Sequence, residues 1–321
     1  MIEIGLNAVI VAVDDPQPLV LTVATPVAQQ APSLPFGPFD PERHRTFEIG
    51  LREWVEEQTA LTLGYVEQLY TFGDRGRHHI HSDEGPHVVS VGYLALARQT
   101  SESEEALARE NATWRSWYDF FPWEDWRSGC PGIVTEHILP ALERWVAAPV
   151  PAGSPPRAQS REDRMHQAFD IQDGIWDEEK VLDRFELLFE AGLLAEARRD
   201  GRPAALERPC LPPLGQAMLY DHRRILATAI SRLRAKLKYR PVVFELMPRT
   251  FTLTDLQRCV EAISGRHVHK QNFRRLVDKA ELVEPTGETS TQTGGRPAAL
   301  FRFRREVLKE RPALGLRVGG R

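Results

Sequence analysis

The chain lacks the features that membrane, secreted and metal-cluster proteins depend on. It has three cysteines in 321 residues, and they lie far apart in the sequence (Cys130, Cys210 and Cys259). This spacing forms neither a disulfide framework nor a zinc pattern. No apolar run approaches the roughly 18 residues of a membrane span, and the apolar first strand has no basic start that would mark a signal peptide. These absences predict a reduced, cytoplasmic protein with no membrane contact.

The net charge is small, but the charged residues are unevenly distributed along the chain. The whole chain carries a formal net charge of −4, which alone argues against a nucleic-acid partner. Residues 266–321, however, hold 13 Lys and Arg against 6 Asp and Glu, whereas residues 1–150 hold 10 against 22. A basic module on an acidic body is what phosphate contact at one end of the molecule requires.

The most informative segment runs from Phe251 to Arg305. Thr254 and Gln257 have the spacing of a capping box, which predicts the start of a helix that ends at Gly265. A second helix is predicted over residues 268–280. Two short strands are predicted after it, near 282–284 and 299–303. This order is typical of a winged helix-turn-helix.

The second of these helices is the candidate recognition helix. Its apolar residues face inward, which leaves polar residues for the major groove, where Gln and Asn pair with adenine and Arg pairs with guanine. Together with an arginine of the wing, the predicted DNA-binding residues are His269, Lys270, Gln271, Asn272, Arg274, Arg275 and Arg296. The alternative is a structural winged helix that serves only for dimerisation.

The N-terminal half predicts a different architecture. Its expected elements are strands over 3–13, 18–25, 65–72 and 88–97, and helices over 43–58 and 134–146. This order suits an α/β/α sandwich around a mixed sheet.

Prolines at 149–156 mark a linker. Helices are expected beyond it, the longest over residues 217–239. The predicted division is therefore a sensing domain (1–148), a helical connecting region (149–215) and a DNA-binding domain (216–321). Residues 185–206 weakly resemble residues 273–300, because both segments end in GRPAAL. A true repeat would make the first segment a second helix-hairpin.

One helix of the first domain carries a group of carboxylates. Glu53 and Glu57 share a face four residues apart, with Glu56 beside them and Arg52 before them. Carboxylates gathered in this way favour a divalent cation such as Mg²⁺, which would bind a pyrophosphate and activate water. The alternative is a solvated acidic face.

The loop over residues 73–87 is the candidate ligand segment. Arg75 and Arg77 are suited to a diphosphate, and the histidines of the loop offer further donors (His78, His79, His81 and His87). A histidine metal cluster and an unliganded loop are the alternatives. The aromatic segment 114–126 also has two interpretations: its rings stack on a base of the ligand, or they pack in the core.

The carboxylate helix resembles the Nudix box, G-x5-E-x7-R-E-U-x-E-E-x-G-U. The match is partial: His44 stands where the box has its first glutamate, Thr59 where it has its later glycine, and Gly37 is one position out of register. The resemblance therefore implies a retained fold without hydrolase activity, because metal sites tolerate the loss of orienting groups poorly.

A degenerate Nudix domain followed by a winged helix resembles the Nudix-related transcriptional regulators of NAD metabolism (NrtR-like), and most closely the NadQ-type regulators. The resemblance rests on FTLTDLQ, NFRRLV, GGRPAALFRF and WYDFFPWEDWR, and it covers nearly the whole chain. It implies a dimeric repressor of NAD synthesis or salvage genes that binds palindromic double-stranded DNA and needs no cofactor.

The same resemblance implies an effector, NAD or ADP-ribose. The residues expected to bind it are Arg52, Arg75, Arg77 and His79. Two alternatives stay open. One is a Mg²⁺-dependent pyrophosphohydrolase that acts on ADP-ribose through Glu53, Glu56 and Glu57; the other is a DNA-binding protein that is insensitive to ligands.

Overall fold

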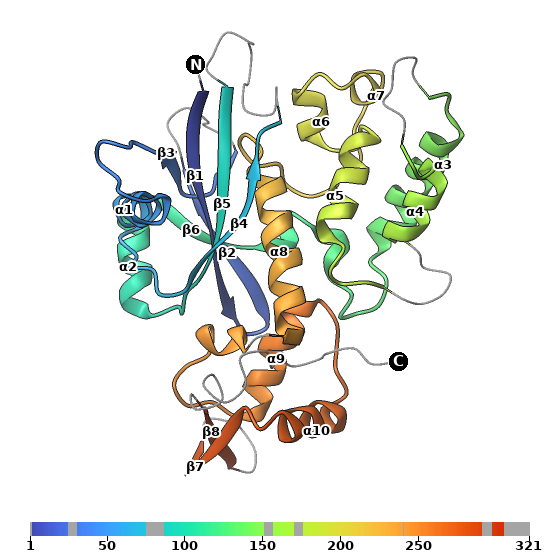
Figure 1. Ribbon diagram of the computed structural model, residues 1–321. Helices are drawn as coiled ribbons and strands as arrows, with labels where there is room; N and C mark the ends of the chain where they lie inside the picture. The colour runs from blue at the N-terminus through green and yellow to red at the C-terminus, as the bar shows by residue number, and fades with distance from the viewer. Residues whose placement is uncertain are drawn as a thin grey trace.

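A mixed β-sheet lies at the centre of the N-terminal half (Figure 1). The computed structural model describes residues 2–24, 31–74, 87–150, 157–169, 176–239, 241–290 and 297–304. The strands are β1 (Ile2–Asp14), β2 (Gln17–Val23), β3 (Phe36–Pro38), β4 (Val66–Phe72), β5 (His87–Leu96) and β6 (Ala112–Ser116). Their order is β4-β5-β1-β2-β6, and β3 pairs with β1. Only the pairing of β1 with β5 is parallel; the others are antiparallel.

Helices cover both faces of this sheet. On one face lie α1 (Phe47–Thr59) and α2 (Ser101–Arg109), while α8 (His222–Tyr239) crosses the other (Figure 1). Leu51 and Val55 of α1 are fully buried against the first face. The predicted α/β/α sandwich is therefore confirmed. Helix α1 begins later than predicted, because Thr46 caps it by accepting a hydrogen bond from the N–H of Ile49.

The aromatic segment packs in the core rather than offering a stacking platform. It forms two 3₁₀ turns, Trp117–Asp119 and Pro122–Glu124. Trp117 and Trp123 are fully buried, as are the two phenylalanines between them. They fill the space between the sheet and the helices beyond it.

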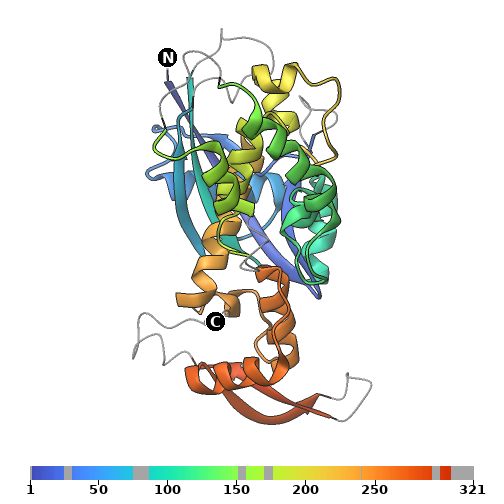
Figure 2. The same ribbon diagram turned by 90° about the vertical axis from the view of Figure 1, so that its right-hand side faces the viewer.

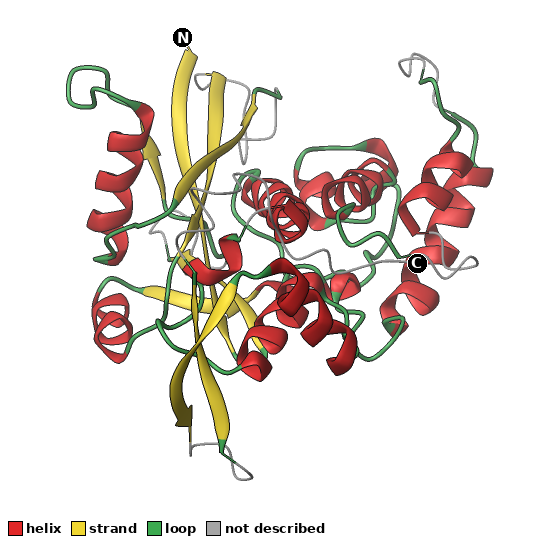
Figure 3. Ribbon diagram, turned by 60° about the horizontal axis from the view of Figure 1, so that its bottom comes forward, coloured by secondary structure: helices red, strands yellow, loops and turns green. Residues whose placement is uncertain are grey.

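In the residues described, the regular elements of the connecting region (149–215) are all helices. They are α4 (Arg161–Phe169), α5 (Val181–Glu190), α6 (Ala195–Arg199) and α7 (Pro203–Leu206), and a π-helical turn (Val134–Ile138) and α3 (Leu139–Ala147) directly precede the region. These helices gather on the α8 side of the sheet (Figure 3). The division at residues 148 and 215 stays a prediction. Helix α8, which that division groups with the winged helix, packs on the sheet as well as on α5 and α9.

The C-terminal part folds as a winged helix at the end of the molecule furthest from the N-terminus (Figure 2). Its elements are a 3₁₀ turn (Val242–Glu245), α9 (Leu253–Ser264), α10 (Lys270–Ala280), β7 (Val283–Ser290) and β8 (Ala298–Phe303). The predicted N-cap, Thr254, was wrong. Thr252 caps α9 in a reciprocal box with Asp255, because Phe251 pairs with Phe301 and leaves the next residue at the helix start.

The carboxyl end of α9 is docked onto the body of the protein. The hydroxyl of Tyr118 donates a hydrogen bond to the carbonyl of Ala262 at 2.8 Å. The backbone N–H of Trp126 donates to the carbonyl of Gly265, also at 2.8 Å. Burial raises the pKa of Tyr118, so its hydroxyl stays protonated and able to donate. The last carbonyls of a helix have no partner within it, and here the aromatic segment supplies partners.

Gly265 is expected to be intolerant of a side chain. It adopts φ +72°, and a Cβ there would lie 2.4 Å from the carbonyl oxygen of Glu124. Gly129 is the matched control, because it has φ +94° but open space around its Cβ position. Gly265→Ala should therefore lower the free energy of unfolding by about 1–3 kcal/mol more than Gly129→Ala, the usual range for overpacking. Urea denaturation measures both, and equal losses would contradict the docking geometry.

Candidate nucleic-acid interface and carboxylate helix

Helix α10 presents one apolar and one polar face. Phe273 and Val277 are buried against the winged-helix core. The residues of this helix and its N-cap that were predicted to contact DNA are all exposed: His269, Lys270, Gln271, Asn272, Arg274 and Arg275. Within the described residues, the cations at 270, 274 and 275 form no ion pair, so their charge is available to a phosphate backbone.

A buried carboxylate fixes the turn that leads into α10. Glu261 accepts hydrogen bonds from the N–H of Val268 at 2.8 Å and from Gln257 at 2.9 Å, and it lies 3.0 Å from Nδ1 of His267. Burial acts to raise the pKa of Glu261, but these hydrogen bonds outweigh it and hold the pKa below its usual value. Sequence analysis missed this residue, although an acid in the last turn of a helix opposes the macrodipole and so indicates a specific role.

The wing consists of β7 and β8. Arg302 pairs across the two strands with Glu284 at 2.6 Å, and Arg304 donates to the carbonyl of Glu281. Strand β7 is longer than predicted and carries a register shift between Pro285 and Thr289. The predicted wing contact, Arg296, lies outside the described residues.

The carboxylate helix has its own cationic partners. Glu53 lies 2.6 Å from the guanidinium of Arg43 and 3.0 Å from Nε2 of His44, and Arg43 lies 3.9 Å from Glu57. His44, at the position of the missing box glutamate, is 2% exposed and accepts a hydrogen bond from the N–H of Asp40. In the described part of the chain no group of His, Cys, Asp and Glu is arranged to hold a metal ion. Arg43 thus supplies positive charge beside two of the three glutamates of this helix.

Arg52 is bound within the same unit. Its guanidinium donates to Glu48 at 2.9 Å and to the carbonyls of Leu63 and Gly64. These contacts already use its donors on two sides. Its role in binding ligand stays a prediction.

The ligand segment that follows β4 is described only at its ends. Arg75, Arg77, His78, His79 and His81 lie outside the described residues. At one end, Asp74 pairs with Arg224 of α8. At the other, His87 begins β5.

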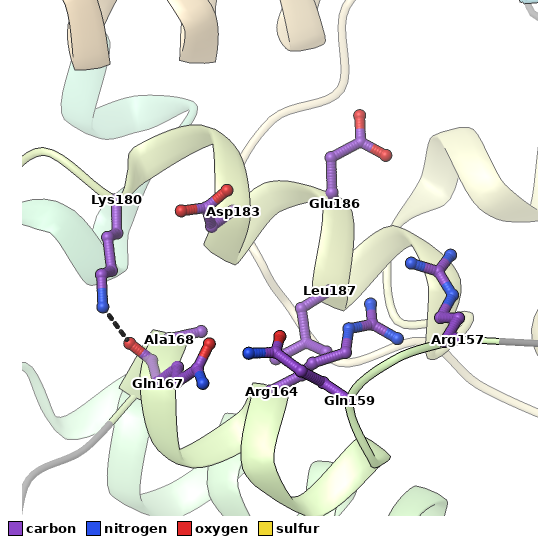
Figure 4. Close-up of a pocket in the computed structure, with 9 residues that line it drawn as sticks. All are labelled: Arg157, Gln159, Arg164, Gln167, Ala168, Lys180, Asp183, Glu186 and Leu187. Atoms are coloured by element: carbon purple, nitrogen blue, oxygen red, sulfur yellow. Dashed lines mark hydrogen bonds between the residues drawn. The ribbon is translucent and has the colours of Figure 1, made fainter.

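A polar pocket lies elsewhere, between α4 and α5 (Figure 4). Arg157 and Arg164 line it, and both pair with Glu190, at 2.9 and 2.6 Å. Lys180 donates to the carbonyl of Gln167 at 3.0 Å. The cations of this pocket are thus already paired within the protein.

Two comparisons by sequence bear on the winged helix. The family model described as the NrtR DNA-binding winged helix domain matches residues 243–303. That segment is therefore similar to the NrtR winged helix domain. A curated relative, the ADPR responsive transcriptional repressor NtrR of Acinetobacter baylyi, is 40% identical over 86 residues, 27% of this chain. The match spans about a third (34%) of that relative's length.

Comparisons of structure extend over the whole chain. The structure of Shewanella oneidensis NrtR in complex with a 27mer DNA is similar, with a TM-score of 0.56 and 20% identity, over 98% of both chains. A MutT/nudix family protein from Enterococcus faecalis gives 0.52 and 13% identity over 95% of this chain and 87% of its own. The fold is thus a Nudix-like α/β/α sandwich with a C-terminal NrtR-type winged helix, as predicted. In the described residues no helix has the length and apolar character to cross a membrane.

Proposed function

We propose that the protein is a transcriptional repressor of NAD biosynthesis or salvage genes and acts as a homodimer on palindromic double-stranded DNA. The observation that carries this proposal is the exposed basic face of α10 within an NrtR-type winged helix. A two-fold dimer would present two such helices to two half-sites, which is why a palindromic operator is expected.

An NAD-related nucleotide is the proposed effector, with ADP-ribose the first candidate. The support is the name of the relative from Acinetobacter baylyi, which describes a repressor responsive to ADP-ribose, and the Nudix-like sandwich. Arg52, Arg75, Arg77 and His79 are the proposed ligand contacts. NAD is the second candidate, and neither proposal requires a metal.

The test is DNA selection on fragmented genomic DNA, with the purified protein alone, with NAD and with ADP-ribose. We expect palindromic sites upstream of NAD biosynthesis or salvage genes to be enriched, and one nucleotide to change that enrichment. Absence of enrichment under all three conditions would contradict the repressor function. Enrichment that neither nucleotide changes would leave a ligand-insensitive DNA-binding protein.

The alternative function is Mg²⁺-dependent hydrolysis of ADP-ribose. The ion pair of Glu53 with Arg43 disfavours it, because a guanidinium already binds a carboxylate that a metal would need. We expect the ADP-ribose affinity to change less than about twofold between Mg²⁺ and EDTA, since no metal-bridged contact is involved. Titration calorimetry measures this, and Mg²⁺-dependent release of AMP that Glu57→Gln abolishes would favour the hydrolase instead.

A further inference from the structure

The pocket between α4 and α5 is formed by these two helices and the segment before α4, not by the sheet or the winged helix (Figure 4). Its volume is about 260 Å³. At roughly 30 Å³ for each water molecule, this is room for about nine waters, and it falls below the range of about 300–1,000 Å³ that is usual for drug-sized ligands. A ligand of this pocket is therefore a small molecule, smaller than a nucleotide.

The face that α5 turns to the pocket changes in character along the helix. Asp183, Leu187 and Glu190 lie on this one face, because their spacing in the sequence is four and then three residues. Asp183 is exposed and Leu187 is buried. Asp183 and Glu190 are about 10 Å apart along the helix axis. The pocket thus has two polar ends, with apolar surface between them to which Ala168 of α4 contributes.

The end at Glu190 carries an excess of positive charge. Glu190 lies 2.6 Å from the guanidinium of Arg164 and 2.9 Å from that of Arg157. Burial acts to raise the pKa of Glu190, but the hydrogen bond from Arg164 and the charges of the arginines outweigh it and lower the pKa. One carboxylate offsets only one of the two guanidiniums. Arg157 is 54% exposed, and most of its donors are available to a carboxylate of a ligand.

The other end of the pocket carries an available carboxylate. Two acidic side chains of α5 line the pocket, Asp183 and Glu186. Glu186 pairs with Arg224 of α8. Asp183 forms no ion pair or hydrogen bond within the part of the chain that the structure describes. It is therefore free to bind a cationic group.

Lys180 borders the same end but is directed elsewhere. Its ammonium group donates to the carbonyl of Gln167 at 3.0 Å and lies 4.0 Å from Asp177. Figure 4 shows the side chain of Lys180 reaching toward Gln167, with Asp183 on the near side of the pocket and Arg157 on the opposite side. The charge of Lys180 is thus compensated away from Asp183.

We propose that this pocket binds a small aliphatic zwitterion, an ω-amino acid, with its ammonium group on Asp183 and its carboxylate on Arg157. The methylene groups between the two charges lie against Leu187 and Ala168. A simple anion would be repelled by Asp183, and a simple cation by the excess guanidinium charge, so neither would use both ends. This inference does not rest on the proposed function, because it involves neither a nucleotide nor DNA.

Titration calorimetry on the full-length protein tests the ligand class. The probes are γ-aminobutyrate, δ-aminovalerate and ε-aminocaproate, which increase in length by one methylene group at a time. We expect the best of them to bind with a dissociation constant below about 1 mM. Valerate lacks the ammonium group and pentylamine lacks the carboxylate. Each should bind at least about tenfold more weakly than the best probe, because one charge-assisted hydrogen bond is lost.

Asp183→Asn and Arg157→Gln test the two ends of the pocket. Each should weaken binding of the best probe at least about tenfold, by removal of one charged partner. Neither change should unfold the protein, because Asp183 is exposed and Glu190 keeps Arg164 when Arg157 is replaced. Far-UV circular dichroism checks that the fold is retained.

Glu162→Gln and Arg109→Gln are the matched controls. Both side chains are exposed, on α4 and α2, and neither lines the pocket. Affinity for the best probe should stay within about twofold of that of the unmodified protein, since screening confines the influence of distant surface charges.

Three results would overturn the inference. The first is binding weaker than about 1 mM by all three ω-amino acids. The second is valerate or pentylamine binding as tightly as the best probe, which would indicate a site for a simple ion. The third is an affinity that Asp183→Asn or Arg157→Gln leaves unchanged, or that the controls reduce equally, which would place the ligand outside this pocket.

Discussion

Replacing Glu124 by glutamine is expected to lower the free energy of unfolding by about 3–5 kcal/mol, the range found when one partner of a buried ion pair is removed. Among the residues that the structure describes, Glu124 is the only carboxylate paired with the two buried guanidiniums of Arg184 and Arg234. Glutamine keeps the shape and one acceptor oxygen, but it leaves two desolvated cations without a counter-charge. The measurement is urea denaturation followed by far-UV circular dichroism.

Glu105→Gln provides the control. It removes the same charge from a side chain that is 79% exposed and lies 3.8 Å from Arg109. Exposed pairs of this kind contribute little to stability, so the midpoint of the transition should not move. A loss for Glu124→Gln as small as that of the control would show that the network does not hold the fold together.

This network could not be predicted from the sequence. Glu124 stands within WEDW, and the pattern there indicates only that the aromatic residues share a function, either packing or stacking. Its partners, Arg184 and Arg234, lie 60 and 110 residues further on. A charge is normally expected at the surface, and only the three-dimensional arrangement reveals that these three compensate one another.

The winged helix was predictable because its signals are local. Helical periodicity, the glycine at position 265 and the apolar residues of α10 each lie within one element. The start of α9 was less secure, since Thr252 and Thr254 each have a plausible partner three residues later. The Phe251–Phe301 pairing decides between them, and it joins residues 50 positions apart.

The repeated hexapeptide shows the limit of local signals. GRPAAL contributes a short helix, α7, in its first copy and the start of β8 in its second. In the first copy Ala205 is buried and its backbone lies close to Gly192, whereas in the second the chain pairs with β7. Tertiary packing thus overrides sequence identity over this length, and within the described residues the likeness of residues 185–206 to 273–300 does not extend to the conformation of the shared Ala-Ala-Leu.

The degenerate metal site was only half predictable. The departures at His44 and Thr59 from the Nudix pattern are visible in the sequence and predict a loss of activity. The pairing of these glutamates with Arg43 is not visible there, because Arg43 is brought to Glu53 and Glu57 by the turn before α1. The same turn places His44 against Gly50, where a Cβ would lie 2.7 Å from Nδ1.

The second large effect is expected on DNA binding, from Arg274→Ala combined with Arg275→Ala. Both side chains are exposed on α10. Each arginine that contacts a phosphate releases about one counterion, so the plot of log affinity against log salt should become shallower by about 2. Affinity at fixed salt should fall at least about tenfold. Fluorescence anisotropy on a selected site over a range of salt concentrations measures both quantities.

Arg109→Ala separates a local from a general electrostatic effect. Arg109 is 76% exposed at the end of α2, on the sandwich rather than on the winged helix (Figure 1). Removing its charge alters the net charge of the protein without touching α10. Screening over a Debye length of about 10 Å at 0.1 M salt confines its influence, so the salt slope should stay as in the unmodified protein. If the α10 double variant kept that slope too, α10 would not be the recognition helix, and the basic wing would be the remaining candidate.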